Sequence, residues 1–137
     1  MAVLVDTGIL YAAADRRDRW HKRALEFLRD ADEPLLVPFA VLPEACYFLQ
    51  TRLGIAQRDA LLDSFAKGGL VLAENTSADL LRAREICGQY RNVELDLADA
   101  CLIAVAERLK ITRIATTDRR DFSLVRPAHC DKFELLP

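Results

Sequence analysis

Four acidic residues of this 137-residue chain stand inside or directly beside apolar sequence: Asp6 in VLVDT, Glu44 in VLPEACYFL, Asp99 in LDLADACLIAVAERL and Asp118 in IATTDRRDF. Ionised carboxylates are costly to remove from water, so acids in such places are capped, paired or bound to a cation. Two carboxylates about 5 Å apart repel each other by roughly 3 kcal/mol at an effective dielectric constant near 20. A divalent cation reverses the sign of that interaction, and a set of oxygen ligands suits Mg²⁺ or Mn²⁺ better than Zn²⁺.

Each of these acids also has an ordinary structural explanation when it is considered alone. Asp6 could cap the helix that follows it, and Glu44 occupies a favourable first helical turn. Asp96 and Asp99 stand three residues apart, as in a helix cap, and we assign Asp96 to the cap itself. Asp118 could belong to a polar turn. Because four acids would not gather in one crevice for stability, the set as a whole favours a cation site in which Asp6 is a ligand.

Short apolar runs alternate along the chain with longer stretches of helical periodicity. This alternation predicts βαβ units, and therefore a mainly parallel sheet with helices on both faces. Ligands of such sheets bind outside the carboxyl ends of the strands, where Asp6 and Asp118 would both emerge. The run LADACLIAVAERLK is so apolar that its helix should be central and buried. The predicted strands are 2–5, 34–38, 70–73, 113–117 and 132–136, and the predicted helices are 8–14, 18–31, 39–54, 57–68, 77–90 and 97–110.

Individual polar residues and glycines mark the expected ends of these elements. Thr7 and Ser77 are expected to cap the N-termini of their helices, and Gly54 is expected to close the helix before it. Two adjacent threonines, Thr116 and Thr117, precede the last of the four acids. Either hydroxyl is placed to hold a ligand carboxylate or a phosphate oxygen.

Length and composition limit the class of protein. A chain of 137 residues, of which 52% are hydrophobic and 29% charged, is expected to form one domain over 1–137 with its own core. No apolar run approaches the roughly 20 residues that span a membrane, and the N-terminus lacks the features of a signal peptide. We therefore expect a cytoplasmic protein. The four scattered cysteines form no CxxC pair, which favours buried thiols over disulfides or a zinc site.

The net charge of −2 gives no general sign of a nucleic-acid partner, but arginines gather in two clusters. The planar guanidinium group suits phosphate, which it can bind through two hydrogen bonds. Such clusters are also commonly solvated faces. We single out Arg16 and Arg17 in the first cluster, and Arg119 and Arg120 after the last acid, as candidate contacts to a nucleic-acid backbone around the acidic pocket.

In this order and at this length, the motifs resemble those of the PIN-domain ribonucleases, and among them the VapC-type toxins of prokaryotic toxin–antitoxin pairs. The resemblance runs from VLVDTGIL to TTDRRDFSLVRP, with HKRA, VLPEACYFL and LDLADACLIAVAERL between them. It implies a three-layer α/β/α sandwich around a mainly parallel sheet, with an acidic pocket for Mg²⁺ or Mn²⁺. It also implies an RNA endonuclease that forms a homodimer and is inhibited by a small cognate antitoxin.

The resemblance also assigns roles to individual residues. It gives metal-binding and catalytic roles to the four acids and a catalytic role to a small hydroxyl residue. It also places two further residues next to these, where they support the ligands without binding the ion. In that order, the residues are Asp6, Glu44, Asp99 and Asp118, then Thr116, then Asp96 and Thr117.

Other classes of protein fit the sequence less well. A haloacid-dehalogenase-like phosphatase needs a second Asp two residues after the first, where this chain has Gly8. A receiver domain needs an acidic pair after the first strand and a lysine near the last, and neither is present. The remaining alternative is a catalytically inert PIN-like module that binds RNA or a protein. The presence of all four acids argues against it.

Overall fold

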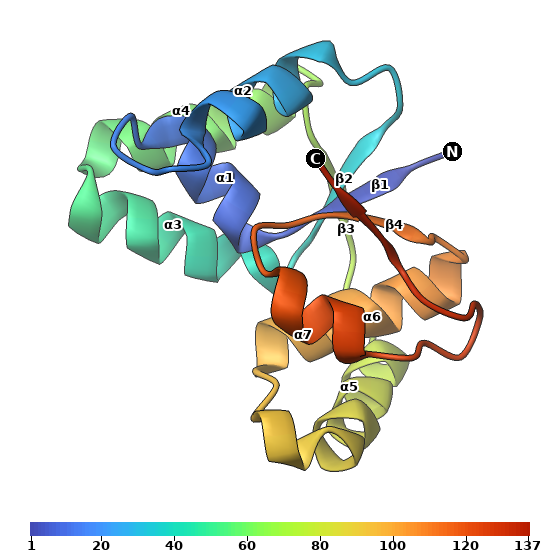
Figure 1. Cartoon of the computed structure of the whole chain (residues 1–137). Helices are drawn as coiled ribbons and strands as arrows, with labels where there is room; N and C mark the ends of the chain where they lie inside the picture. The colour runs from blue at the N-terminus through green and yellow to red at the C-terminus, as the bar shows by residue number, and fades with distance from the viewer.

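The chain folds into three layers, in which a five-stranded parallel sheet lies between two groups of helices. The computed structural model describes all of residues 1–137. Figure 1 shows α1 to α4 gathered on one face of the sheet and α5 to α7 on the other, which confirms the predicted α/β/α sandwich. In chain order the elements are β1 (Val3–Val5), α1 (Thr7–Ala14), α2 (His21–Asp30), β2 (Leu35–Pro38), α3 (Val41–Arg52), α4 (Ile55–Ala66), β3 (Val71–Ala73), α5 (Ser77–Gln89), a 3₁₀ turn (Arg91–Val93), α6 (Leu97–Leu109), β4 (Arg113–Ala115), α7 (Arg119–Leu124) and β5 (Glu134–Leu136).

The order of the strands determines which side chains meet at the edge of the sheet. The order is β3-β2-β1-β4-β5, and every neighbouring pair is parallel. From the central β1 the chain builds one side of the sheet with β2 and β3 and later the other with β4 and β5. A crevice opens beside the carboxyl ends of the strands at such a reversal point. The backbone N–H of Asp6 donates to the carbonyl of Ala115 at 3.0 Å, so the segments that leave β1 and β4 lie side by side.

Helix α6 is the central helix of the layer formed by α5, α6 and α7. Its seven consecutive residues from Ala100 to Ala106 are all buried. Side chains can be buried on every side of a helix only if other elements surround it, and α6 packs against α5 and contacts α3 and β2. The predicted burial of this helix is therefore confirmed, and its first turn carries Asp99 to the edge of the sheet.

Two helix caps lie one residue earlier than expected. Asp6 rather than Thr7 caps α1, and its carboxylate accepts a hydrogen bond from the Thr7 N–H at 2.8 Å. Thr76 rather than Ser77 caps α5, in a reciprocal capping box with Asp79. A cap residue must have an extended backbone, and Asp6 and Thr76 have it, with φ and ψ of −90° and 163°, and of −85° and 168°. Gly54, with φ of 108°, follows α3 as predicted.

Helix α7 and the 3₁₀ turn were not among the predicted elements. The turn at Arg91–Val93 has three residues, and α7 has six. Segments this short contain too few residues for a hydrophobic period to be recognised. Helix α7 is nevertheless important for the site, because it begins directly after Asp118 and carries Asp121 in its first turn.

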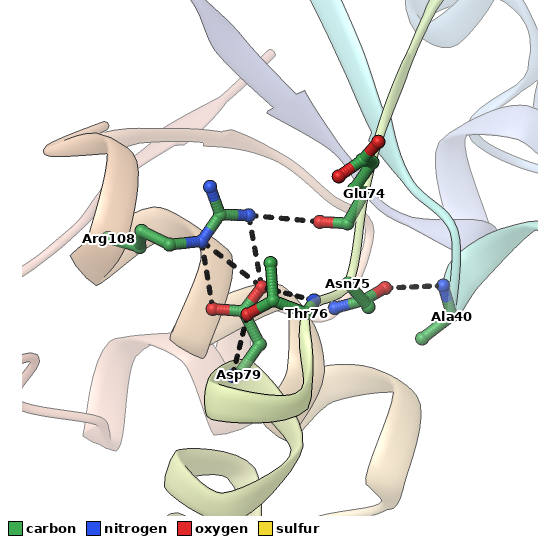
Figure 2. A network of polar contacts seen from close by, with 6 residues as sticks. All are labelled: Ala40, Glu74, Asn75, Thr76, Asp79 and Arg108. Carbon is green, nitrogen blue, oxygen red and sulfur yellow. Dashed lines mark hydrogen bonds and ion pairs between the residues drawn. The ribbon is translucent and has the colours of Figure 1, made fainter.

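A polar network joins α5 and α6 to the loop after β3 (Figure 2). The carboxylate of Asp79 accepts hydrogen bonds from the guanidinium group of Arg108, with Nη2 at 3.0 Å, and the same Nη2 donates to the Glu74 carbonyl. Asn75 accepts a hydrogen bond from the backbone N–H of Ala40, directly before α3, at 2.8 Å. The network therefore connects α5 and α6 with the helix that carries Glu44.

His21 and three of the four cysteines lie in helices. His21 lies in the first turn of α2, and its Nδ1 is 2.8 Å from the carbonyl oxygen of Ala12. All four cysteines are free thiols, with Cys101 buried in α6 and Cys46 half-buried in α3. None of the helices combines the length and the apolar composition needed to cross a membrane.

Candidate metal centre

A cleft of about 240 Å³ opens beside the carboxyl ends of β1 and β4. It is bounded by the segments that follow these two strands, by one face of α3 and by the first turn of α6. Five carboxylates line it, which brings together all four acids singled out in the sequence and Asp96. These residues are Asp6, Glu44, Asp96, Asp99 and Asp118.

Thr116 ties two of these acids to each other. Its fully buried hydroxyl donates to Oδ2 of Asp6 at 2.9 Å and accepts a hydrogen bond from the backbone N–H of Asp118, also at 2.9 Å. The other oxygen of Asp6 accepts the N–H of Thr7. One hydroxyl therefore positions the carboxylate after β1 and the backbone that carries the carboxylate after β4.

Asp96 and Asp99 divide the roles that their spacing predicts. Asp96 caps α6 and accepts a hydrogen bond from the Asp99 N–H at 2.8 Å. Asp99 is only 8% exposed, and its carboxylate accepts no hydrogen bond within the chain. Asp99 is thus a buried acid whose oxygens are free to bind something else in the cleft.

Burial and mutual repulsion change the acidity of the cleft. Burial raises the pKa of Asp99 to about 9, and the charges of Asp6, Asp96, Asp118 and Glu44 add to this effect. Burial also raises the pKa of Asp6 to about 6, although the hydrogen bonds from Thr116 and Thr7 act in the opposite direction. Both shifts mean that the ionised carboxylates are disfavoured, first by burial and then by the neighbouring negative charges, and a bound cation would offset both effects.

Asp121 joins the site and was not among the residues predicted from the sequence. One oxygen each from Asp99, Asp118 and Asp121 lie within 4.8 Å of one another. Burial and the charge of Asp118 raise the pKa of Asp121. The available signal was the spacing in DRRD, because Asp118 caps α7 and accepts a hydrogen bond from the Asp121 N–H at 3.1 Å.

The donor set of the cleft fits a hard divalent cation. Every candidate ligand is a carboxylate oxygen, which Mg²⁺ and Mn²⁺ prefer. Ligands on opposite sides of a Mg²⁺ ion lie about 4 Å apart, since each is 2.0–2.1 Å from the ion. The oxygens of Asp99, Asp118 and Asp121 all lie within 4.8 Å of one another, which is close to that span.

Gly8 allows α1 to approach the wall of the cleft. A Cβ atom at Gly8 would lie 2.2 Å from Oγ1 of Thr117 and 3.3 Å from its Cβ. Any larger residue would therefore have to displace Thr117, which lines the cleft beside Asp118. The close contact accounts for a glycine in the first turn of α1.

The four arginines singled out in the sequence lie outside the cleft lining. Arg119 donates to the carbonyl oxygen of Leu135 at 3.2 Å and to that of Pro137. Arg16, Arg17 and Arg120 are exposed. The cleft is lined instead by a different arginine, Arg52 at the end of α3. Contacts between RNA and Arg16, Arg17, Arg119 and Arg120 stay a prediction.

Comparisons with known proteins agree with this geometry. The family model described as the PIN domain matches residues 3–126, and the chain belongs to the PIN-domain family. Ribonuclease VapC26 of Mycobacterium tuberculosis is 30% identical to this chain over 135 residues, which are 98% of this chain and 100% of that protein.

Two crystal structures of other proteins share the fold. VapC20 of Mycobacterium tuberculosis, described as a toxin that cleaves the sarcin–ricin loop, has a TM-score of 0.76 and 20% identity, over 82% of this chain and 86% of that one. VapBC2 of Rickettsia felis, bound to a DNA fragment from its promoter, has a TM-score of 0.70 and 16% identity, over 100% of both chains. At these identities the two structures establish the fold alone.

Proposed function

We propose that this protein is a Mg²⁺- or Mn²⁺-dependent endoribonuclease and the toxin of a toxin–antitoxin pair. Membership of the PIN-domain family and the similarity to Ribonuclease VapC26 support this class of activity. The observation that carries the proposal is the cleft itself. Asp99 and Asp118 of the cleft and Asp121 of α7 present oxygens within 4.8 Å of one another, and the cleft also contains a buried Asp6 whose pKa is raised.

The residues of the cleft divide the work of phosphodiester hydrolysis. Asp99, Asp118 and Asp121 would hold the cation, with Asp6 beside them, and Thr116 fixes the positions of Asp6 and Asp118. When bound there, a divalent ion would supply positive charge at the RNA phosphate and would favour ionisation of an attacking water. Glu44 lines the same cleft from the first turn of α3, where it can orient that water or accept its proton.

We also propose a cognate antitoxin as partner, a homodimer as the assembly, and the cytoplasm as the location. An apolar groove between α1, α2, α3 and α4 supports a protein partner, since Leu25 and Leu28 among its lining residues are accessible and accessible apolar side chains favour association. The groove has a volume of about 330 Å³. Leucine side chains dominate its lining, namely Leu10, Leu25, Leu28, Leu49, Leu61 and Leu70.

The proposed activity can be tested with purified protein that is free of any partner. The protein is incubated with structured RNAs in Mg²⁺, in Mn²⁺ and in EDTA, and the cleavage products are resolved by electrophoresis. We expect cleavage only when a divalent ion is present. The variants Asp6→Asn and Asp99→Asn should lose at least about 100-fold in rate, since each removes a charge from the ion's site.

Asp63→Asn is the matched control, because Asp63 is an exposed acid of α4 outside the cleft. It should cleave like the unaltered protein. Cleavage in EDTA, or full activity of Asp6→Asn and Asp99→Asn, would contradict the proposed mechanism. RNA binding without any cleavage would favour the inert RNA-binding module instead. Addition of the small protein encoded by the neighbouring gene should abolish cleavage if that protein is the antitoxin.

A further inference from the structure

Arg52 is the one positively charged side chain among the residues that line the acidic cleft. It belongs to the last turn of α3, where a positive charge is favourable near the negative end of the helix. Glu44, Phe48 and Arg52 are spaced by four residues, so they follow one another along one face of α3. The same helix therefore presents an acid and a guanidinium group to the cleft.

Two aromatic rings position the guanidinium group of Arg52. Its central carbon lies 4.4 Å from the centre of the Phe48 ring and 5.3 Å from the centre of the Tyr11 ring. Tyr11 is itself fixed, because its hydroxyl donates to the carboxylate of Asp15 at 2.6 Å. Contacts with the faces of the two rings, together with an interaction with the Tyr11 hydroxyl, hold Arg52 while leaving further N–H groups available.

Arg52 forms no ion pair, although five carboxylates line the same cleft. Other arginines of the chain do pair: Arg82 with Glu107 at 2.7 Å and Arg108 with Asp79 at 3.0 Å. A guanidinium group that served only to neutralise the acids would be expected to contact one of them. The side chain of Arg52 is instead exposed and open to a ligand from solution.

We propose that Arg52 is a substrate-binding residue, which holds a phosphate group of the RNA next to the one at the acids. This inference rests on the proposed ribonuclease function and names a contact that the substrate makes. The acidic cleft repels an RNA backbone, so a positive group in its wall is needed to bring a neighbouring phosphate close. The guanidinium group can donate two parallel hydrogen bonds to phosphate oxygens. Because the two rings already orient it, little side-chain freedom is lost on binding.

Binding of a fluorescently labelled, mixed-sequence single-stranded RNA tests the proposal, measured by anisotropy over a range of salt concentrations. In these titrations Mg²⁺ is replaced by Ca²⁺, which carboxylate oxygens also bind. We expect Arg52→Ala to bind about tenfold more weakly, with a salt dependence lower by about 0.7, as for the loss of one phosphate contact on a single strand. Arg52→Lys should keep the salt dependence but bind about threefold more weakly, because the charge remains and the two parallel hydrogen bonds do not.

Arg84→Ala is the control, since Arg84 is an exposed and unpaired arginine of α5 outside the cleft. It should match the unaltered protein. Calorimetric titration with Mn²⁺ in the absence of RNA provides the second readout. Arg52→Ala should bind Mn²⁺ at least as tightly as the unaltered protein, because Arg52 is not a ligand of the ion.

The outcomes separate this inference from the proposed function. If the unaltered protein binds Mn²⁺ and RNA, and Arg52→Ala matches it in RNA affinity and salt dependence, only the role of Arg52 is overturned. A loss of Mn²⁺ affinity in both Arg52 variants would also overturn it, because the residue would then act on the ion's site. If the unaltered protein binds neither Mn²⁺ nor RNA, both proposals fail. Should Arg52→Ala not fold, Arg52→Lys and its comparison with Arg84→Ala decide the question.

Discussion

Thr116 contributes more to the cleft than its small side chain suggests. It is fully buried, and its hydroxyl makes one hydrogen bond as a donor to Asp6 and one as an acceptor from the Asp118 N–H. Its loss would leave a buried carboxylate oxygen of Asp6 and a half-buried N–H of Asp118 without a partner, and it would remove the donor that lowers the pKa of Asp6. Thr116 therefore affects both the stability of the sheet edge and the affinity of the site for a cation.

We predict that Thr116→Val reduces both stability and metal affinity. The free energy of unfolding should fall by about 1–3 kcal/mol, because an N–H and a carboxylate oxygen lose their partner. Mn²⁺ affinity should fall by about 10- to 100-fold, as for other residues that orient metal ligands. Urea denaturation and calorimetric titration measure the two effects. Thr116→Ser keeps the hydroxyl and should behave like the unaltered protein, whereas unchanged Mn²⁺ binding by Thr116→Val would contradict the role given to Thr116.

At the scale of elements, the layer formed by α5, α6 and α7 depends on the pairing of α5 with α6 (Figure 2). Asp79 is 3% exposed as a side chain, and burial alone would raise its pKa. The hydrogen bonds from Arg108 and from the backbone of Thr76 nevertheless hold the pKa of Asp79 below its usual value. The pair of Asp79 and Arg108 therefore stabilises the fold at pH values above the ordinary pKa of an aspartate. This stabilisation is lost as the pH falls and the Asp79 carboxylate is protonated.

We predict that Arg108→Met lowers the free energy of unfolding by about 2 kcal/mol at neutral pH. The loss is smaller than the 3–5 kcal/mol typical of a fully buried pair, because the Arg108 side chain is 37% exposed to screening by water. Urea denaturation measures it, with Arg84→Met on α5 as the control. The double variant Arg108→Met, Asp79→Asn should recover part of the loss. A single variant as stable as the unaltered protein would show that Asp79 does not depend on Arg108.

At the scale of the whole molecule, the site makes the stability of the fold depend on pH and on a cation. Asp6 and Asp99 have raised pKa values, so the folded chain retains protons that the unfolded chain releases. Their contribution is fully present below about pH 4 and is lost as the pH rises towards the folded-state values of about 6 and about 9. A divalent ion binds the ionised carboxylates and should offset this loss.

We predict that the melting temperature of the metal-free protein in EDTA falls between about pH 5 and about pH 9. The titration of Asp6 alone would account for a loss of about 1.4 kcal/mol over this range, because about one pH unit separates pH 5 from its folded-state pKa of about 6 and a tenfold change in proton affinity corresponds to about 1.4 kcal/mol. Added Mg²⁺ or Mn²⁺ should raise the melting temperature more at the higher pH. Calorimetric melting of the protein and of Asp99→Asn checks this: the variant should show a weaker pH dependence. A melting temperature in EDTA that rises across this range would contradict the prediction.

The amino-acid sequence by itself determined the class of fold and the main acids of the site. Alternating apolar runs and helical periods predict a parallel sheet between helices, because each such segment must bury an apolar face. Since parallel strands end at one edge, Asp6 and Asp118 could be placed there before any strand order was known. The helices were recognised where they span several turns, as in α6, and missed where they were as short as α7.

Tertiary structure decided which residues complete the site. The sequence does not say that β1 pairs with β4, and this pairing joins Asp6 to Thr116 and Asp118. Helix α7 brings Asp121 within reach of Asp99, and the packing of α1 against α3 places Tyr11 beside Arg52 in the cleft. Local patterns determine which elements form, because they depend on neighbours in the chain. Contacts between residues far apart in the chain depend on how those elements pack, so only the folded molecule reveals them.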